Sequence, residues 1–408
     1  MMSEVATLRL KPAEDRRLRQ GHVWVFSNEV DVDRTPLTDL QPGQLVVVEN
    51  SKGKPLGSGY VNPNTLICAR LYSHLPGVPF SRALITQRLQ TALALRERVF
   101  NAPYYRWAFA ESDGLPGLIV DRYGDVVALQ VNTAGMERVQ DDIIEAIRSL
   151  INPRAILLRH ETSGRVMEGL EQYVRWVEGT GPERVIVKEH DAQFNVDLFA
   201  GQKTGWFYDQ STNRARMRTY VRDQRVLDVF SYVGAWGVQA ALAGAKQVVC
   251  VDSSQAALDQ VLTNAQLNGV ERRVSVATGD AFDMLKTLRD EHEKFDVVII
   301  DPPALIKRKK DLKEGIAAYH HLNQLALRLV ADNGILISCS CSYHLPRTEL
   351  MNIIHTAGRH CDRELQILEQ CHHGPDHPVH PAIPETEYLK AYIARAWSET
   401  PIRHEPDN

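Results

Sequence analysis

Four aspartates stand at or just after the ends of apolar runs in the C-terminal half of the chain. They are Asp228, Asp252, Asp280 and Asp301. The runs are rich in β-branched residues and alternate with helical patterns, which predicts a parallel sheet. Ligands of open α/β sheets bind outside the carboxyl ends of the strands, so these carboxylates are predicted to line one crevice.

The first of these runs leads into the glycine-containing loop D-V-F-S-Y-V-G-A-W-G, residues 228–237. Gly234 and Gly237 allow close backbone approach to a ligand, and Asp252, 24 residues after Asp228, could accept hydrogen bonds from ribose hydroxyls. The loop lacks the G-x-G-x-x-G pattern of pyrophosphate binding, which argues against a nicotinamide dehydrogenase. Its acidic first residue suits a cationic amino or sulfonium group better than a phosphate.

Two cysteines in the run G-I-L-I-S-C-S-C-S, residues 334–342, could do nucleophilic chemistry. Cys339 and Cys341 are two apart and therefore share one face of a predicted fifth strand. A thiolate at the carboxyl end of that strand could attack carbon 6 of a pyrimidine and make carbon 5 nucleophilic. We predict Cys341 as the nucleophile and Cys339 as a packing residue.

Basic residues cluster at a few places, although the formal charge of the chain is −4. Contact with nucleic acid must therefore come from local patches. The clusters are Arg16, Arg17 and Arg19; Arg214, Arg216 and Arg218; and Lys307, Arg308, Lys309 and Lys310. The last cluster follows Asp301-Pro302-Pro303 and is predicted to contact phosphates beside an unstacked base, with Arg16 and Arg17 as a second RNA contact.

The elements that must position these residues form three predicted domains in 408 residues. Short alternating strands predict a small β domain over 1–75, and mixed patterns predict an α+β domain over 76–190. The strand and helix alternation predicts a Rossmann-like α/β domain over 191–408. The composition, 44% hydrophobic and 24% charged, is that of a globular protein.

Six sparse cysteines, no secretory signal and no apolar stretch of membrane-spanning length predict a soluble cytoplasmic protein without membrane association. The segment C-H-H-G-P-D-H-P-V-H, residues 371–380, contains metal-ligand residue types. Its spacing fits no tetrahedral site and prolines interrupt it, so no bound metal is predicted.

The series of acidic strand ends resembles class I S-adenosylmethionine-dependent methyltransferases. The resemblance implies a cofactor site made of Asp228, Phe230, Gly234, Gly237, Asp252, Asp280 and Asp301. It places Asp228 near the methionine end, Asp252 at the ribose hydroxyls and Asp280 at the adenine amino group. Asp301 would lie beside the transferred methyl group.

Four motifs together resemble the bacterial 23S ribosomal RNA cytosine-C5 methyltransferases of the RlmI type. They are G-Q-K-T-G-W-F-Y-D-Q (201–210), D-V-F-S-Y-V-G-A-W-G (228–237), D-P-P-A-L-I-K-R-K-K (301–310) and S-C-S-C-S (338–342). Upstream, G-H-V-W-V-F (21–26) is similar to that family's RNA-binding PUA domain, and D-G-L-P-G-L-I-V-D-R-Y-G (113–124) to its central domain. The resemblance implies methylation of one cytosine of 23S ribosomal RNA, with Cys341 as nucleophile.

The chain departs from the family pattern at two places. Ser211 stands where the family has an arginine, and Pro302-Pro303 occupies a loop that carries a second cysteine in many RNA cytosine methyltransferases. Asp301 is therefore our candidate for the base that removes the proton from carbon 5.

Two other functions stay open. One is methylation of exocyclic base nitrogens, with which D-P-P motifs are associated in this superfamily. The other is a catalytically inert RNA-binding factor of ribosome assembly, against which the intact acidic strand ends and Cys341 argue. The target nucleotide, naked RNA or an assembled particle as substrate, and a monomeric or homodimeric state are also left open.

Overall fold

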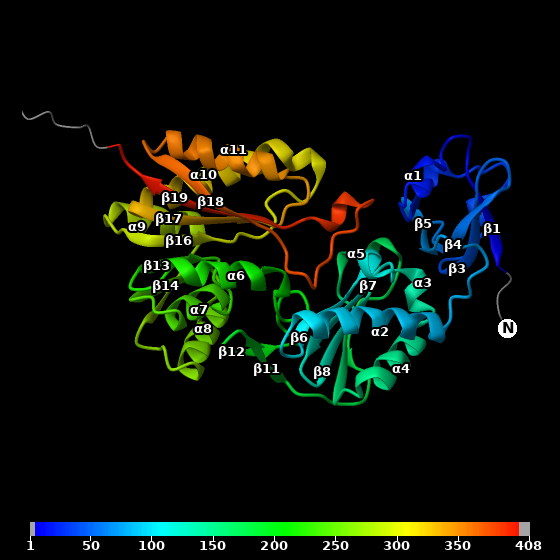
Figure 1. Ribbon diagram of the computed structural model, residues 1–408, viewed down its shortest axis with the longest axis horizontal. Helices are drawn as coiled ribbons and strands as arrows, with labels where there is room; N and C mark the ends of the chain where they lie inside the picture. Colours follow the sequence, from blue (N-terminus) through cyan, green and yellow to red (C-terminus); the bar gives the residue numbers. More distant parts are fainter. Residues whose placement is uncertain (1–4, 400–408) are drawn as a thin grey trace, which may run out of the picture. The chain divides into compact units, whose positions relative to one another are not determined.

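The computed structural model describes residues 5–399, which form two compact units (Figure 1). Each unit is made of segments that are discontinuous in sequence. The first unit contains the described residues up to Val187, Val196–Tyr208 and Pro375–Thr386. The second contains Lys188–Asn195, Asp209–Gly374 and the described residues from Glu387 onward.

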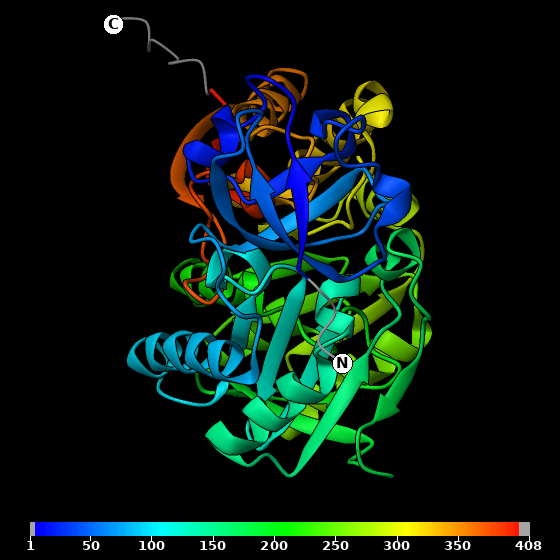
Figure 2. The same ribbon diagram turned by 90° about the vertical axis from the view of Figure 1, so that its right-hand side faces the viewer.

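The first unit begins with a five-stranded sheet in the order β1-β3-β4-β5-β2, drawn in blue in Figure 2. Its elements are β1 (Ala6–Arg9), α1 (Arg16–Arg19), β2 (Trp24–Phe26), β3 (Gln44–Glu49), β4 (Pro55–Val61) and β5 (Ile67–Ser73). Val46 and Val48 alternate with less buried neighbours along β3, as expected for a strand with one face on a core. The predicted small β domain is therefore present.

A second five-stranded sheet in the first unit has the order β10-β9-β8-β7-β6. Its strands are β6 (Tyr104–Phe109), β7 (Leu118–Tyr123), β8 (Val126–Val131), β9 (Ala155–Arg159) and β10 (Val174–Trp176). Helices α2 (Arg82–Val99) and α4 (Gln140–Ile151) pack side by side on it (Figure 1). The same unit contains the short α3 (Ala134–Glu137), which contacts β4, and α5 (Ser163–Met167). β11 (Arg184–Glu189) and β12 (Ala192–Asp197) form a separate ladder.

The second unit is built on a seven-stranded sheet in the order β15-β14-β13-β16-β17-β19-β18. Its strands are β13 (Arg225–Val229), β14 (Gln247–Asp252), β15 (Val274–Thr278), β16 (Phe295–Ile300), β17 (Val330–Ser340), β18 (Glu364–Cys371) and β19 (Lys390–Trp397). β13 to β17 are mutually parallel, and β19 runs antiparallel to both of its neighbours. The strand order reverses between β13 and β16, which is the switch point where ligands of such sheets bind.

Helices cover both faces of this sheet (Figure 1), so the predicted Rossmann-like α/β fold is confirmed. The helices are α6 (Ser211–Met217), α7 (Ala235–Leu242), α8 (Gln255–Leu267), α9 (Ala281–Asp290), α10 (Leu312–Leu329) and α11 (Arg347–Arg359). β16 ends in four fully buried residues, Val297 to Ile300, as a strand covered on both faces should. None of the helices between residues 5 and 399 combines the length and the hydropathy that a membrane-spanning helix needs.

Candidate active site

Asp228 lies at the switch point of the seven-stranded sheet, where it pairs in register with Cys250 of β14 and Ile299 of β16. Its side chain is fully buried, and Oδ2 accepts a hydrogen bond from the Gly237 N–H at 2.9 Å. Oδ1 is buried without a partner among the described residues. Burial, with smaller contributions from the charges of Asp301 and Asp252, raises the pKa of Asp228 to about 7.

The loop after β13 is held in an unusual backbone conformation. Phe230, Tyr232 and Gly234 have φ angles of 65°, 50° and 83°, a left-handed region that costs energy for residues other than glycine. Asp252 at the end of β14 stabilises this conformation, because its Oδ2 accepts the Tyr232 N–H at 2.9 Å. A Cβ at Gly237 would lie 2.4 Å from the Cys250 sulfur, so glycine is required there.

Asp301 follows β16, on the other side of the switch point. Its Oδ1 accepts a hydrogen bond from Gln210 Nε2 at 2.9 Å, and its Oδ2 accepts one from Trp236 Nε1 at 3.0 Å. These contacts fix the plane of the carboxylate. Gln210 and Trp236 have no role predicted from the sequence, although both lie within the motifs 201–210 and 228–237.

Asp280 is the N-cap of α9 and is exposed. Its Oδ1 accepts the backbone N–H of Phe282 at 2.9 Å and of Asp283 at 3.3 Å. Such a cap satisfies amide groups that a helix start leaves unpaired. Asp280 therefore stabilises the start of α9.

The two cysteines of β17 have different surroundings. Cys339 is fully buried, and burial raises the pKa of its thiol well above the ordinary value. Cys341 is the first residue after the strand and is partly exposed. Its sulfur lies 3.9 Å from the carbonyl oxygen of Pro302, so Cys341 and the Asp301-Pro302-Pro303 loop meet at the carboxyl ends of β16 and β17.

The basic run 307–310 is exposed directly after this loop. Arg308 forms an ion pair with Asp311 at 2.9 Å. Beside the run is an open groove of about 530 Å³. The groove is lined by Leu305, Lys307, Arg308, Asp311, Glu314, Gly315 and Ala318. The structure thus places four cations and a concave surface next to the D-P-P loop.

The other basic clusters differ in accessibility. Arg16 is exposed, whereas Arg17 forms an ion pair with Glu29 at 2.6 Å and stacks over the Phe26 ring. Arg214 is buried and pairs with Glu189 through two hydrogen bonds of 2.6 and 2.7 Å. Arg214 is therefore a structural residue of the second unit, and the cluster that contains it is not a continuous basic surface.

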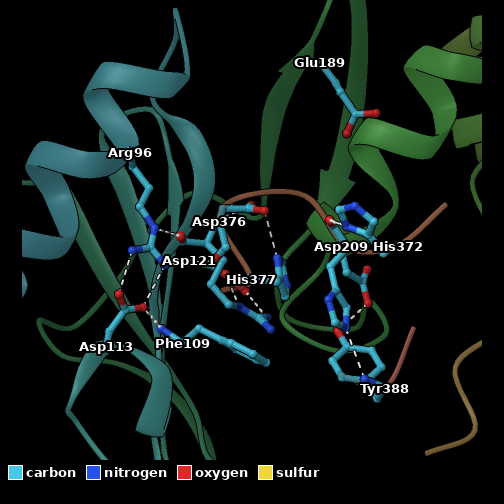
Figure 3. A network of polar contacts seen from close by, with 12 residues as sticks. Arg96, Phe109, Asp113, Asp121, Glu189, Asp209, His372, Asp376, His377 and Tyr388 are labelled. Atoms are coloured by element: carbon cyan, nitrogen blue, oxygen red, sulfur yellow. Dashed lines mark hydrogen bonds and ion pairs between the residues drawn. The ribbon is translucent and has the colours of Figure 1, made fainter. Parts of the chain in front are cut away.

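The segment after β18 makes structural contacts through Asp376 and His377. In the first unit, Arg96 donates two hydrogen bonds of 2.7 Å to Asp113 and one of 2.9 Å to the Asp376 carbonyl, as Figure 3 shows. Asp376 Oδ1 lies 2.9 Å from His377 Nδ1. Among residues 5–399, no group of three or more His, Cys, Asp or Glu side chains is placed to hold a metal ion.

Comparison with known proteins identifies the fold and its chemistry. Residues 8–74 match the PUA-like domain, and residues 154–393 match the S-adenosylmethionine-dependent methyltransferase domain. Ribosomal RNA large subunit methyltransferase I of Erwinia tasmaniensis is 35% identical over 95% of this chain and 98% of its own. The Cronobacter sakazakii protein of the same name is 34% identical over 94% and 97%. The chain belongs to this S-adenosylmethionine-dependent methyltransferase family.

A solved structure supports the fold of this methyltransferase over nearly its whole length. A Streptococcus mutans protein described as an S-adenosylmethionine-dependent methyltransferase covers 96% of this chain and all of its own, with a TM-score of 0.81 and 22% identity. A second one, crystallised with S-adenosylhomocysteine, gives a TM-score of 0.82. The PUA-like domain, the methyltransferase domain and the cofactor predicted from the sequence are thus confirmed.

The switch-point residues fit S-adenosylmethionine, whose sulfonium and amino groups are cationic. Asp228, Asp252 and Asp301 lie close enough for the charges of the last two to raise the pKa of the first. The buried Oδ1 of Asp228, which has no hydrogen-bond partner within residues 5–399, leaves an acceptor at this point. A Cβ at Gly234 would lie 3.0 Å from the Val261 side chain, so this glycine, like Gly237, is constrained by packing inside the protein. When bound, the cofactor supplies the methyl group.

Replacing Asp252 with alanine is expected to weaken S-adenosylmethionine binding by about 1.5–3 kcal/mol, the typical value of hydrogen bonds to a charged group. The variant also loses the bond from Tyr232 that shapes the loop. Isothermal titration calorimetry measures the effect, with the exposed Asp259→Ala on α8 as control. Unchanged cofactor affinity in folded Asp252→Ala protein would contradict the assignment of Asp252 to the cofactor site.

Proposed function

We propose that this enzyme methylates carbon 5 of one cytosine in 23S ribosomal RNA through a covalent adduct with Cys341. The observation that carries the proposal is the position of the Cys341 thiol, partly exposed and 3.9 Å from the Pro302 carbonyl beside Asp301. The names of the curated relatives and the PUA-like domain support ribosomal RNA as the substrate. A ribosomal substrate would place the enzyme in the cytoplasm.

In the proposed reaction, the Cys341 thiolate forms a bond to carbon 6 of the cytosine and the electrons of the 5,6 double bond move to carbon 5. Carbon 5 then accepts the methyl group. Asp301 removes the remaining proton from carbon 5, the double bond reforms and the bond between sulfur and carbon 6 breaks. Gln210 and Trp236 hold the Asp301 carboxylate through one hydrogen bond to each oxygen.

The cofactor residues and the RNA residues have separate parts in this proposal. Asp228, Phe230, Gly234, Gly237 and Asp252 would hold the cofactor at the carboxyl ends of β13 and β14, together with Asp280 at the start of α9. The exposed run 307–310 would contact phosphates on either side of the inserted base. Arg16 and Arg17 remain a second proposed RNA contact.

The product of the reaction tests the proposal. Ribosomal RNA from a strain lacking the gene is incubated with the enzyme and S-adenosylmethionine, digested to nucleosides and analysed by mass spectrometry. We expect 5-methylcytidine. An N-methylated nucleoside would instead support base-nitrogen methylation, which the D-P-P sequence after β16 favours as the second candidate. RNA binding without any methylated product, on naked RNA or on ribosomal particles, would support an inert assembly factor.

Replacing the four cations of 307–310 with glutamine is expected to weaken RNA binding and to flatten its salt dependence. Each cation that contacts a phosphate of single-stranded RNA contributes roughly 0.7 to the slope of log affinity against log salt, because it releases a counterion. Binding titrations at several salt concentrations measure this slope. A control replaces Arg222, Lys246 and Arg272 with glutamine; these three exposed cations precede β13, β14 and β15, at the amino ends of the strands. An unchanged slope in the 307–310 variant would exclude phosphate contacts by this run.

A further inference from the structure

A buried lysine lies beside the proposed nucleophile. Lys390 is the first residue of β19 and pairs in register with Ser340, the residue before Cys341. Its side chain is buried, with an exposed fraction of 4%. The ammonium group donates hydrogen bonds to the carbonyl oxygens of Ser342, at 2.6 Å, and Tyr388, at 2.9 Å. An ammonium carries three N–H donors, so two carbonyls do not use all of them.

The position of this ammonium is unusual, because buried lysines are rare unless they are paired with an opposite charge. Both acceptors above are uncharged backbone carbonyls, and one of them belongs to the residue directly after Cys341. The charge of a Cys341 thiolate interacts favourably with Lys390. Cys341 is therefore a group at this site that could balance the buried positive charge.

Other titratable groups also face this pair. The charge of Arg347 on α11 lowers the pKa of Lys390, and the charge of Glu387 raises it. The charge of Cys341 also raises the pKa of Tyr319 on α10. Burial lowers the pKa of Lys390 to about 8, and the negative charge of Cys341 acts against that shift. Below about pH 8 the ammonium is thus largely protonated and able to stabilise a neighbouring anion.

We propose that Lys390 is a positioning residue that stabilises the Cys341 thiolate and fixes the backbone after it through the Ser342 carbonyl. The thiol proton passes to solvent before the base enters, so the nucleophile is already charged. The inference deepens the proposed function and rests on it for its biological meaning. The electrostatic pairing itself can be measured without RNA.

The test is the pH dependence of alkylation of Cys341 by iodoacetamide in the full-length protein. The rate follows the thiolate fraction, and peptide mass spectrometry reports Cys341 separately from the partly exposed Cys361, which serves as an internal reference. Wild-type protein is expected to show an apparent pKa for Cys341 below the ordinary thiol value of about 8.5. Lys390→Met is expected to raise that apparent pKa by about one unit or more, whereas Lys390→Arg keeps it close to wild type.

Lys294→Met is the control for removing an ammonium far from Cys341; Lys294 is exposed, whereas Lys390 is buried. Lys294 also donates to a backbone carbonyl, that of Arg328 at 2.6 Å, but it precedes β16 at the opposite end of the sheet from Cys341. Its removal should not change the alkylation profile of Cys341. An unchanged profile in folded Lys390→Met protein would overturn the proposal and leave Lys390 a purely structural residue.

The role of Lys390 can be tested even if the variant does not fold or the reaction is not cytosine-C5 methylation. If Lys390→Met does not fold, an apparent pKa of Cys341 at or above about 8.5 in wild-type protein overturns the proposal by itself. An N-methylated nucleoside as the product would instead refute cytosine-C5 methylation. That outcome would leave a lysine-dependent alkylation profile intact, so the two failures are distinguishable.

Discussion

Cys341→Ala protein is expected to lose methyl transfer by a factor of about 10⁴ or more while keeping cofactor affinity near wild type. Loss of a nucleophile that forms a covalent intermediate has effects of this size. Carbon 5 of cytosine is a poor nucleophile until an adduct forms at carbon 6. Transfer of labelled methyl groups to RNA measures the loss, and calorimetry measures the cofactor affinity.

Cys339→Ala is the matched control, since Cys339 lies two residues away and is fully buried. This variant should retain most activity. RNA with 5-fluorocytosine at the target should trap wild-type enzyme covalently, because fluorine blocks the final elimination, and should not trap Cys341→Ala. Substantial methylation by Cys341→Ala, with an N-methylated product, would favour base-nitrogen chemistry instead.

Arg214→Met is expected to lower the free energy of unfolding of the second unit by about 3–5 kcal/mol. The change leaves the Glu189 carboxylate without its guanidinium partner in a buried site, where both side chains have exposed fractions of 5% or less. Gln239, which donates to the same carboxylate at 2.7 Å, cannot neutralise its charge. Urea denaturation followed by circular dichroism measures the loss.

Arg216→Met on the same helix is the control for this prediction. Arg216 also forms an ion pair, with Glu369 at 2.5 Å, but its side chain is 59% exposed, and exposed pairs contribute little to stability. Its unfolding free energy should stay close to wild type. Equal losses of unfolding free energy in the two variants would contradict the assignment of the Arg214→Met effect to burial of its ion pair.

Much of the fold could be predicted because its signals are local in sequence. The apolar run before Asp301 and the strand and helix alternation after Arg225 predicted the parallel sheet, and the structure has β13 to β17 in parallel. Short alternating strands predicted the N-terminal β domain in the same way. Periodicity depends on which face of a strand or helix is buried, and this can be determined from neighbouring residues alone.

The partners of the site residues could not be predicted, because they are brought together by contacts between distant segments. Gln210 and Trp236 bind Asp301 from 91 and 65 residues away. Arg214 looked like one of three clustered cations until the structure paired it with Glu189, 25 residues earlier. A charged side chain gives no local signal of whether it faces solvent or a buried carboxylate.

By itself, the sequence determined which residues could do chemistry and the strand ends at which they stand. Acidic residues after apolar runs, the glycine loop and the two cysteines predicted a cofactor crevice and a nucleophile. Only the tertiary structure decided that Cys341 lies beside the Pro302 carbonyl. It also decided that Lys390, on the antiparallel β19, binds the carbonyl of Ser342, the residue after Cys341. The physical reason is that strand order and register are fixed by packing of the whole sheet, whereas residue type and spacing are fixed by the chain.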